Sequence, residues 1–413
     1  MINYYKFSNF KSYKDTTIVN LVPPKRAVDS YYDFSTPTGG KVSKVIGVFG
    51  ANGSGKTSLI HPLVYMAHFV SGSFGPQNID NSPYPHAHFS AKDKSASFEI
   101  EFCLTHKDES GTFLYKLEVD KERVIFEELK YKTSTQYTSI LKREYIEETG
   151  SYEISKVHKH ISASPSKIME TPENVSAISY IRKVSKFNIK KAESIDEFDK
   201  IYLAHFFFKN IRSNLKDYGR ASTVYTGRAA TEVYQNRPEV FELAKDIMTK
   251  LDLGIVDIEL RKAIIIENDE EKEEIVPFFI HEGEDRTYSL TYANQSTGTQ
   301  TAYRLLASIG QSLSFGGILV LDEFDNDFHS SFSQEILNLF KNDEINTHCA
   351  QVLFSSHNVE LFKELSNHHI YLTEKSEGIS DSWRIDEIEG LKERDNIYKK
   401  YLSGALGALP DFG

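Results

Sequence analysis

Cysteine is scarce in this sequence, and long apolar runs are missing. The two cysteines among 413 residues, Cys103 and Cys349, lie far apart and form no C-x-x-C pair, which argues against a structural zinc site or a zinc hook. The N-terminus is too polar and too aromatic for a signal peptide, and no run approaches the roughly 18–20 apolar residues that a membrane span needs. We therefore expect a soluble, reduced protein of the cytoplasm that does not enter a membrane.

Internal repeats, low-complexity segments and sustained heptads are also missing, so a long coiled-coil arm is not expected. The composition, 40% hydrophobic and 26% charged, is typical of globular proteins. The length allows one large domain or two to three ordinary ones. The net charge of −11 argues against a general nucleic-acid binder. A local basic groove is still an alternative, because net charge does not describe how charge is distributed.

Both ends of the chain alternate between strand-like and helix-like patterns. Residues 44–49 form a short apolar run that is typical of a buried strand, and apolar residues recur at helical spacing over 59–70. Towards the other end the sequence predicts helices and strands in turn, at 299–313, 318–321, 330–340, 351–354 and 369–372. We interpret residues 1–97 and 289–413 as two halves of one α/β core.

The middle of the chain has a different character. Apolar and polar residues alternate along several short runs separated by turn residues, which predicts an antiparallel β subdomain over residues 98–155. Residues 156–288 read as a mostly helical insertion, with strands returning at 256–266 and 275–280. The acidic run 267–274 between those strands is interpreted as an exposed hairpin tip.

Residues 50–57, with the sequence GANGSGKT, match the phosphate-loop pattern G-x-x-x-x-G-K-[ST]. Glycines let successive backbone N–H groups face the phosphates, and the following helix directs its positive end to the same place. Lys56 is expected to reach the β and γ phosphates of ATP, and the Thr57 hydroxyl to bind Mg²⁺. The other residues expected to contact the nucleotide are Asn52, Gly53, Ser54, Gly55 and Ser58. The competing interpretation is a glycine-rich turn that arose by chance.

Two apolar runs end in residues suited to phosphate chemistry. Residues 318–321 are followed by Asp322, which is expected to hold Mg²⁺, and by Glu323, which is expected to act as a general base on water. Residues 351–354 are followed by two serines and His357, an imidazole that could sense a γ-phosphate. The alternatives are a strand ending in acidic turn residues and a structural histidine.

The order of these motifs resembles that of ABC-type ATPases, in their SMC-like and RecF-like branch. Ser296 and Gly298 lie in a stretch, 296–299, that resembles the degenerate signature motif of this branch. Residues 7–13, 325–329 and 401–410 resemble its opening strand, its D-loop and the tails of bacterial members. The signature lacks the second glycine and the terminal glutamine of transporters. The Q-loop residue stays open between Gln77 and the stretch 85–89, whose histidines are interpreted as loop residues.

This resemblance implies an ABC-type P-loop ATPase domain, with a RecA-like core and an antiparallel β subdomain, interrupted by a mixed β and helical insertion. It also implies an active site shared between two subunits, in which Ser296 and Gly298 contact the γ-phosphate bound by a partner copy. ATP would then join a head-to-head dimer, or a larger assembly, that hydrolysis releases.

Within the branch, compact chains resemble ATPases of bacterial anti-phage defence: the overcoming-lysogenization-defect family, the PARIS-system ATPase and the AbiL-type ATPase. Only about 40 residues follow His369, so we expect no nuclease domain there and a separate effector protein instead. The alternative is a RecF-like DNA-binding repair ATPase, favoured by the basic stretch 182–191. A subunit of a membrane transporter fits the signature and the large insertion poorly.

Overall fold

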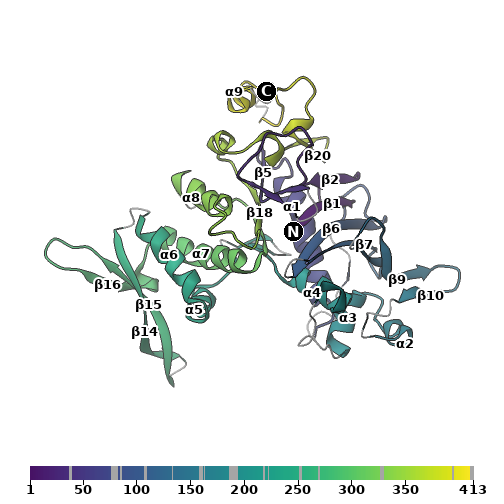
Figure 1. Ribbon diagram of the computed structural model, residues 1–413, viewed down its shortest axis with the longest axis horizontal. Coiled ribbons are helices and arrows are strands. Elements are labelled where there is room, and N and C mark those ends of the chain that lie inside the picture. Colours follow the sequence, from purple (N-terminus) through teal and green to yellow (C-terminus); the bar gives the residue numbers. More distant parts are fainter. Residues whose placement is uncertain are drawn as a thin grey trace.

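Two large sheets organise the chain in the computed structural model (Figure 1). The structure describes residues 1–36, 40–75, 82–83, 86–106, 109–132, 134–157, 161, 163–185, 194–216, 219–221, 223–250, 254–267, 270–325, 330–392 and 395–409. One sheet has six strands and is mainly parallel, and the other has seven antiparallel strands. In these ranges no helix is long and apolar enough to cross a membrane.

The six-stranded sheet carries the apolar runs of both chain ends. Its strands, in spatial order, are β11 (Ile211–Ser213), β17 (Ile318–Leu321), β18 (Gln351–Ser355), β5 (Val45–Gly50), β19 (Ile370–Ser376) and β20 (Ile379–Arg384). Only β20 runs antiparallel to its neighbour among the pairs described. Every residue of β5, β17 and β18 is buried, as expected for parallel strands covered on both faces.

This sheet separates two hydrophobic cores. Along β5, Ile46 and Val48 pack into the core that faces the antiparallel sheet, whereas Val45 and Phe49 pack into the opposite core. The alternation follows from the two-residue period of a strand. The first core includes α1 (Lys56–Gly72), and the second includes α7 (Thr297–Phe315) and α8 (Ser330–Lys341). The predicted strands and helices of both chain ends are thereby confirmed.

The seven-stranded sheet contains the predicted antiparallel meander. Its strands, in spatial order, are β10 (Ser151–Val157), β9 (Thr138–Ile146), β8 (Val124–Lys132), β7 (Glu109–Val119), β6 (Ala96–His106), β1 (Ile2–Ser8) and β2 (Thr17–Asn20). It draws β1 and β2 from the segment 1–97 that the sequence analysis assigned to the α/β core. The domain limits themselves remain predictions.

The segment after β10 is mostly helical, as predicted. Its helices are α2 (Pro165–Met169), α3 (Ala177–Val184), η1 (Ile195–Glu197), α4 (Lys200–Lys209), α5 (Gly227–Asn236) and α6 (Pro238–Lys250). One element corrects the sequence analysis: β11 comes from this segment and pairs in parallel with β17. The α/β core is therefore not built from the chain ends alone. Three residues directly after a helix are too few to show a strand period.

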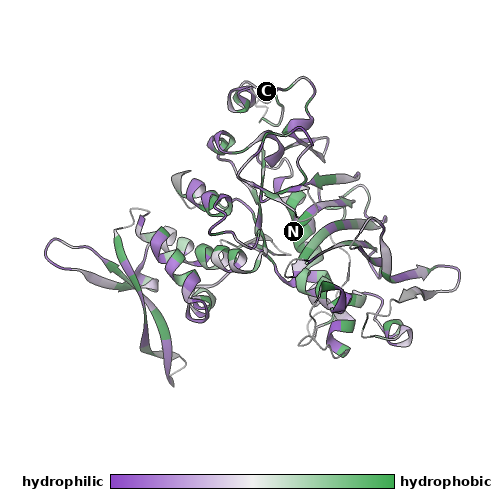
Figure 2. Ribbon diagram, in the orientation of Figure 1, coloured by the Kyte–Doolittle hydropathy of each residue, from purple (hydrophilic) through white to green (hydrophobic). Residues whose placement is uncertain are grey.

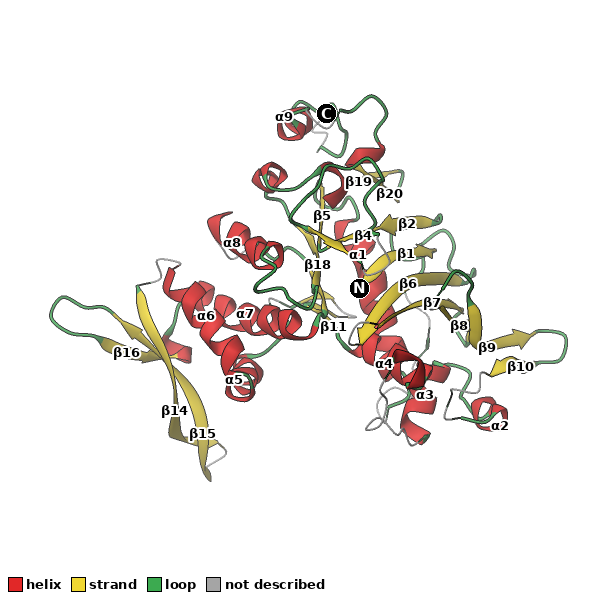
Figure 3. Cartoon of the chain, in the orientation of Figure 1, coloured by secondary structure: helices red, strands yellow, loops and turns green. Residues whose placement is uncertain are grey.

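A long hairpin extends from the helices α5–α7 at one end of the molecule (Figures 1 and 3). It consists of β14 (Ile255–Glu267) and β15 (Glu270–His281), with β16 (Tyr288–Thr291) added beside β15. The acidic run was predicted to form the hairpin tip. Instead, Glu267 pairs with Glu270 and the run continues into β15. Hydrophobic residues run along much of the hairpin (Figure 2), and Ile264 is 68% exposed.

Short elements complete the described chain. They are β3 (Asp33–Ser35), β4 (Lys41–Ser43), β12 (Leu215–Lys216), β13 (Gly219–Arg220), η2 (Tyr292–Asn294), η3 (Val359–Lys363), η4 (Asn367–His369), η5 (Ile385–Glu387) and α9 (Ile397–Leu402).

Candidate functional site

The phosphate-loop motif forms the turn between β5 and α1. Gly50, Gly53 and Gly55 have φ angles of 151°, 76° and 115°, which residues with a side chain rarely adopt. A Cβ atom on Gly50 would lie 2.4 Å from the backbone oxygen of Thr373 on β19. Glycine is therefore needed here both for backbone conformation and for close packing against the neighbouring strand.

Lys56 begins α1 and points back over the loop. Its ammonium donates hydrogen bonds of 3.0 Å to the carbonyl oxygens of Gly50 and Ala51, and the residue is buried. Burial lowers the pKa of Lys56, and the nearby carboxylates of Glu323 and Asp322 oppose this shift. The first turn of α1 holds no acidic residue, so the positive end of the helix and the lysine charge both favour an anion at this place.

Thr57 and Asp322 meet across the sheet edge. The Thr57 hydroxyl lies 2.9 Å from each carboxylate oxygen of Asp322, which follows β17 directly and is only 4% exposed. The Ser355 hydroxyl, at the end of β18, donates to Oδ1 of Asp322 at 2.6 Å. A hydroxyl and a carboxylate are the hard oxygen ligands that Mg²⁺ prefers, so these residues fit the metal that the sequence predicts.

Glu323 and His357 face each other beside this pair. Oε1 of Glu323 lies 3.6 Å from Nε2 of His357, and both side chains are partly exposed. Glu323 has a φ of 47°, a left-handed conformation that is unfavourable for a glutamate. Its backbone N–H donates to the Ser355 hydroxyl at 2.9 Å. A carboxylate and an imidazole that water can reach are suited to proton transfer.

Two further side chains, Asn214 and Ser355, support this cluster without having been predicted to do so. Asn214 follows β11 and bonds the backbone of Asp322 twice: its amide donates to the carbonyl oxygen at 2.9 Å and accepts from the N–H at 2.8 Å. No sequence signal marks it, because β11 is not recognisable. Asp325, the first residue of the predicted D-loop, accepts from the Ser356 hydroxyl at 2.6 Å, and burial raises its pKa. Residues 326–329 of the predicted D-loop lie outside the described residues.

The signature residues Ser296 and Gly298 do not join this cluster. The Ser296 hydroxyl caps α7 by accepting from the N–H of Thr299 at 3.1 Å, and it contacts the Thr299 hydroxyl at 2.8 Å. Among the described residues no side-chain hydrogen bond links Ser296 to the phosphate loop.

Of the two Q-loop candidates, Gln77 lies outside the described residues. In the other, His88 makes loop contacts with the Ser90 hydroxyl at 2.9 Å and the Gly378 carbonyl at 3.3 Å.

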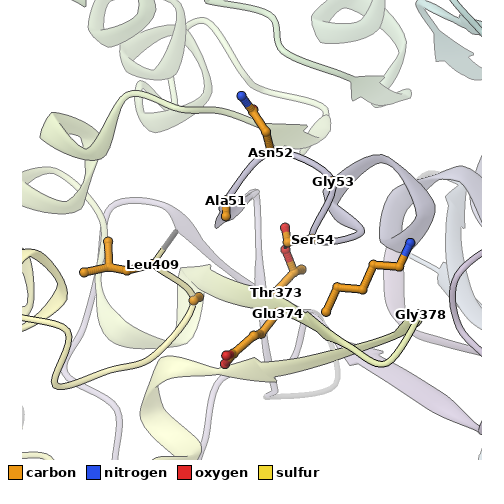
Figure 4. Close-up of a pocket in the computed structure, with 10 residues that line it drawn as sticks. Ala51, Asn52, Gly53, Ser54, Thr373, Glu374, Gly378 and Leu409 are labelled. Carbon is orange, nitrogen blue, oxygen red and sulfur yellow. The ribbon is translucent and has the colours of Figure 1, made fainter. Parts of the chain in front are cut away.

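Open space flanks the phosphate loop on two sides. A cavity of about 640 Å³ lies between Ala51–Ser54, the end of β19 and Ala408–Leu409 (Figure 4). The hydroxyls of Ser54 and Thr373 meet in its wall at 2.6 Å. A second cavity of about 240 Å³ is lined by Ala51, Asn52, His357 and Leu409, among others. The larger cavity is of the size of a small-molecule site and borders the phosphate loop, whereas His357 borders only the smaller one.

One other group of residues in the described chain has the composition of a metal site: Asp33, His368 and His369. The N–H of Ser366 donates to Nδ1 of His369 at 3.2 Å, so the proton of the neutral ring is on Nε2, which donates to Asp33 at 2.9 Å. That nitrogen has no lone pair for a metal. Burial raises the pKa of the Asp33 carboxyl, but hydrogen bonds from both histidines outweigh it and hold the value below its usual range. The group is a buried hydrogen-bond cluster.

The strand–loop–helix turn with Asp322 beside Thr57 defines a P-loop ATPase fold. Residues 45–363 match the family described as "AAA domain, putative AbiEii toxin, Type IV TA system", and the chain belongs to this family. No curated protein matches the sequence.

Two solved structures of SMC head domains are similar over most of their length. An SMC head bound to the C-terminal winged-helix domain of ScpA shares 14% identity and a TM-score of 0.44, covering 94% of this chain and 99% of that one. An SMC head with an extended coiled coil, bound to the C-terminal domain of ScpA from Pyrococcus furiosus, shares 12% identity and a TM-score of 0.42, covering 94% and 97%.

Proposed function

We propose that this chain binds and hydrolyses ATP with the help of Mg²⁺. The observation that carries the proposal is the contact between the Thr57 hydroxyl and both carboxylate oxygens of Asp322 at 2.9 Å. This contact joins the phosphate loop after β5 to the end of β17, which is separated from β5 by β18, at the place where P-loop ATPases hold their metal. Membership of an AAA family supports the same chemistry.

Each residue of the cluster has a distinct task in this proposal. The loop N–H groups and the Lys56 ammonium bind the phosphates, and Lys56 leaves its carbonyl partners to do so. Thr57 and Asp322 hold Mg²⁺, which neutralises charge on the phosphate oxygens when bound. Glu323 orients water and accepts its proton, and His357, which lies 3.6 Å from Glu323, contacts the γ-phosphate. Asn52, Gly53, Ser54, Gly55 and Ser58 complete the phosphate contacts.

We further propose that two copies share the site head to head. Ser296 and Gly298 stand at the start of α7, and the Ser296 hydroxyl bonds only within its own cap in the described chain. A helix N-terminus capped in this way, with no acidic residue in its first turn, is suited to the phosphate of another copy. ATP would hold such a dimer together, and hydrolysis would release it.

The biological role that we propose is control of a separate effector protein, a toxin or nuclease, in bacterial antiviral defence. The family description, which names a toxin of a type IV toxin–antitoxin system, supports a place in such systems. The DNA-repair alternative gains no support, since most of the basic stretch 182–191 lies outside the described residues. Within it, the Arg182 guanidinium packs 5.5 Å from the centre of the Tyr202 ring.

Two variants test the ATPase and the shared site. Lys56→Ala should abolish ATP binding and turnover, whereas Lys41→Ala, which changes an exposed lysine paired with Asp29, should behave as wild type. Glu323→Gln should bind ATP, hydrolyse it at least 100-fold more slowly and remain dimeric with ATP in light scattering. Turnover by Lys56→Ala would refute the assigned site. A monomeric, ATP-bound Glu323→Gln variant would refute the sharing.

The defence role needs a different experiment. The product of a neighbouring gene should co-purify with the wild-type chain and dissociate after addition of ATP or a phage trigger. Salt-sensitive binding of linear duplex DNA, without such a partner, would instead support the repair function.

A further inference from the structure

The turn that carries Asp322 and Glu323 is fixed by two buried side chains to which the sequence assigned no role. Asn214 bonds the backbone of Asp322 on both sides, at 2.8 and 2.9 Å. Ser355 donates to the Asp322 carboxylate at 2.6 Å and accepts from the Glu323 N–H at 2.9 Å. Asn214 is 2% exposed and Ser355 is fully buried, so water cannot readily replace either side chain.

Asn214 continues the pairing of β11 with β17 beyond the end of both strands. The last paired residues are Ser213 and Val320, so Asn214 lies next to the residues that leave the sheet. Its side-chain amide offers one donor and one acceptor, which match the carbonyl and the N–H of Asp322. The side chain thus makes the two hydrogen bonds that the backbone of a longer β11 would make with β17. An aliphatic side chain of the same size could not make either bond.

The turn needs such fixation because its backbone is strained. Glu323 adopts a φ of 47°, a left-handed conformation that is unfavourable for a residue with a side chain. Strained residues of this kind persist only where the surrounding structure over-determines them. Asn214 holds the turn from β11, and Ser355 holds it from β18 on the other side.

We propose that Asn214 is a positioning residue for catalysis: it sets where the Asp322 carboxylate and the Glu323 carboxylate stand relative to Thr57. The proposal rests on the ATPase function proposed above. Asn214 touches neither nucleotide nor metal in this proposal and acts only through the turn. Loss of its two bonds lets the Asp322–Glu323 backbone relax, so the metal ligand and the general base both move, while the phosphate loop and Lys56 stay in place.

The test compares two asparagines at opposite ends of β11. Asn214→Asp keeps the size and the acceptor for the Asp322 N–H, but it places a second acceptor against the Asp322 carbonyl. Asn210→Asp changes the partly exposed C-cap of α4, whose side-chain amide donates to the Phe206 carbonyl of its own helix. Each purified full-length variant is assayed for kcat and KM, for thermal unfolding, and for binding of a fluorescent non-hydrolysable ATP analogue with and without Mg²⁺.

We expect Asn214→Asp to lower kcat at least tenfold and to raise the Mg²⁺ concentration for half-maximal analogue binding at least threefold. Its analogue affinity without Mg²⁺ should stay within twofold of wild type, and Asn210→Asp should match wild type throughout. A folded Asn214→Asp protein with wild-type kcat and Mg²⁺ dependence would overturn the proposal. The proposal would also be overturned if Asn214→Asp lost both thermal stability and affinity for the analogue without Mg²⁺, because such a loss indicates a merely structural role.

The failure of this proposal can be told from failure of the ATPase function. If wild type turns over no ATP, the proposed function fails, yet Mg²⁺-dependent analogue binding still compares the two asparagine variants. Ser355→Ala provides an independent check, because it removes the second support of the same turn. It should reproduce the raised Mg²⁺ requirement, and an unchanged requirement in both Ser355→Ala and Asn214→Asp would overturn the positioning role.

Discussion

Replacing Gly50 by alanine should destabilise the protein far more than the same change at Gly53, although both belong to one loop. At Gly50 a Cβ atom would lie 2.4 Å from the Thr373 backbone oxygen and 2.8 Å from the Ser54 hydroxyl. At Gly53 nothing lies within 4 Å of that atom. Both positions have positive φ angles, 151° and 76°, so both variants carry backbone strain of about 1 kcal/mol. Only Gly50→Ala adds overpacking against a fixed strand, about 2 kcal/mol.

The expected loss of unfolding free energy is therefore about 3 kcal/mol for Gly50→Ala and about 1 kcal/mol for Gly53→Ala. The single tryptophan of the chain, Trp383, offers the readout, since it lies on β20 opposite Leu372 of β19. Its fluorescence during urea unfolding follows the sheet that contains β5. Equal midpoints for the two variants would show that the loop is held by backbone conformation alone and would refute the packing argument.

Two further predictions concern stability away from the site. Burial lowers the pKa of His369 from its ordinary 6.5 to about 4. As the pH falls, the unfolded chain therefore takes up a proton on this histidine before the folded protein does. The stability present above pH 6.5 is lost as the pH falls towards 4, by about 2 kcal/mol at pH 5. His369→Gln should flatten this part of a pH–stability curve, and an unchanged slope would contradict it. Arg143 is 1% exposed and donates to the carbonyls of Thr171, Pro172 and Val175. Arg143→Met should lower the free energy of unfolding by about 3 kcal/mol and open residues 171–175 to proteolysis, whereas Lys142→Met, at a partly exposed position on the same strand, should do neither.

The phosphate loop and the Asp322–Glu323 pair could be predicted because each is contiguous in sequence. The glycines, the lysine and the carboxylates follow apolar runs, and parallel strands bring their carboxyl ends to one edge. The contact of Thr57 with Asp322 is the result. Asn214 could not be predicted, because its importance depends on a three-residue strand that pairs with a segment about 100 residues away.

The fold shows the same limit at a larger scale. Individual strands and helices could be predicted from their periodicity, including the meander and the helices after it. Which sheet a strand joins is decided by partners far along the chain, and periodicity carries no information about them. This is why β1 and β2 join the antiparallel sheet, and why β11 was not expected in the parallel one. The acidic run continues into β15 because pairing with β14 outweighs the low strand propensity of glutamate.

The interleaved order of strands in the two sheets has a consequence for biosynthesis. Strands β1 to β10 all lie within the first 157 residues, and all but β3, β4 and β5 belong to the antiparallel sheet, so that sheet can form while the rest of the chain is still being made. Strand β5 must wait for its neighbour β18, because about 300 residues separate Gly50 from Gln351. At roughly 5–20 residues per second this delay lasts roughly 15–60 s. During it β5, which is buried along its whole length in the folded protein, has no partner in the parallel sheet, so this apolar strand is open to wrong pairing while the chain is on the ribosome.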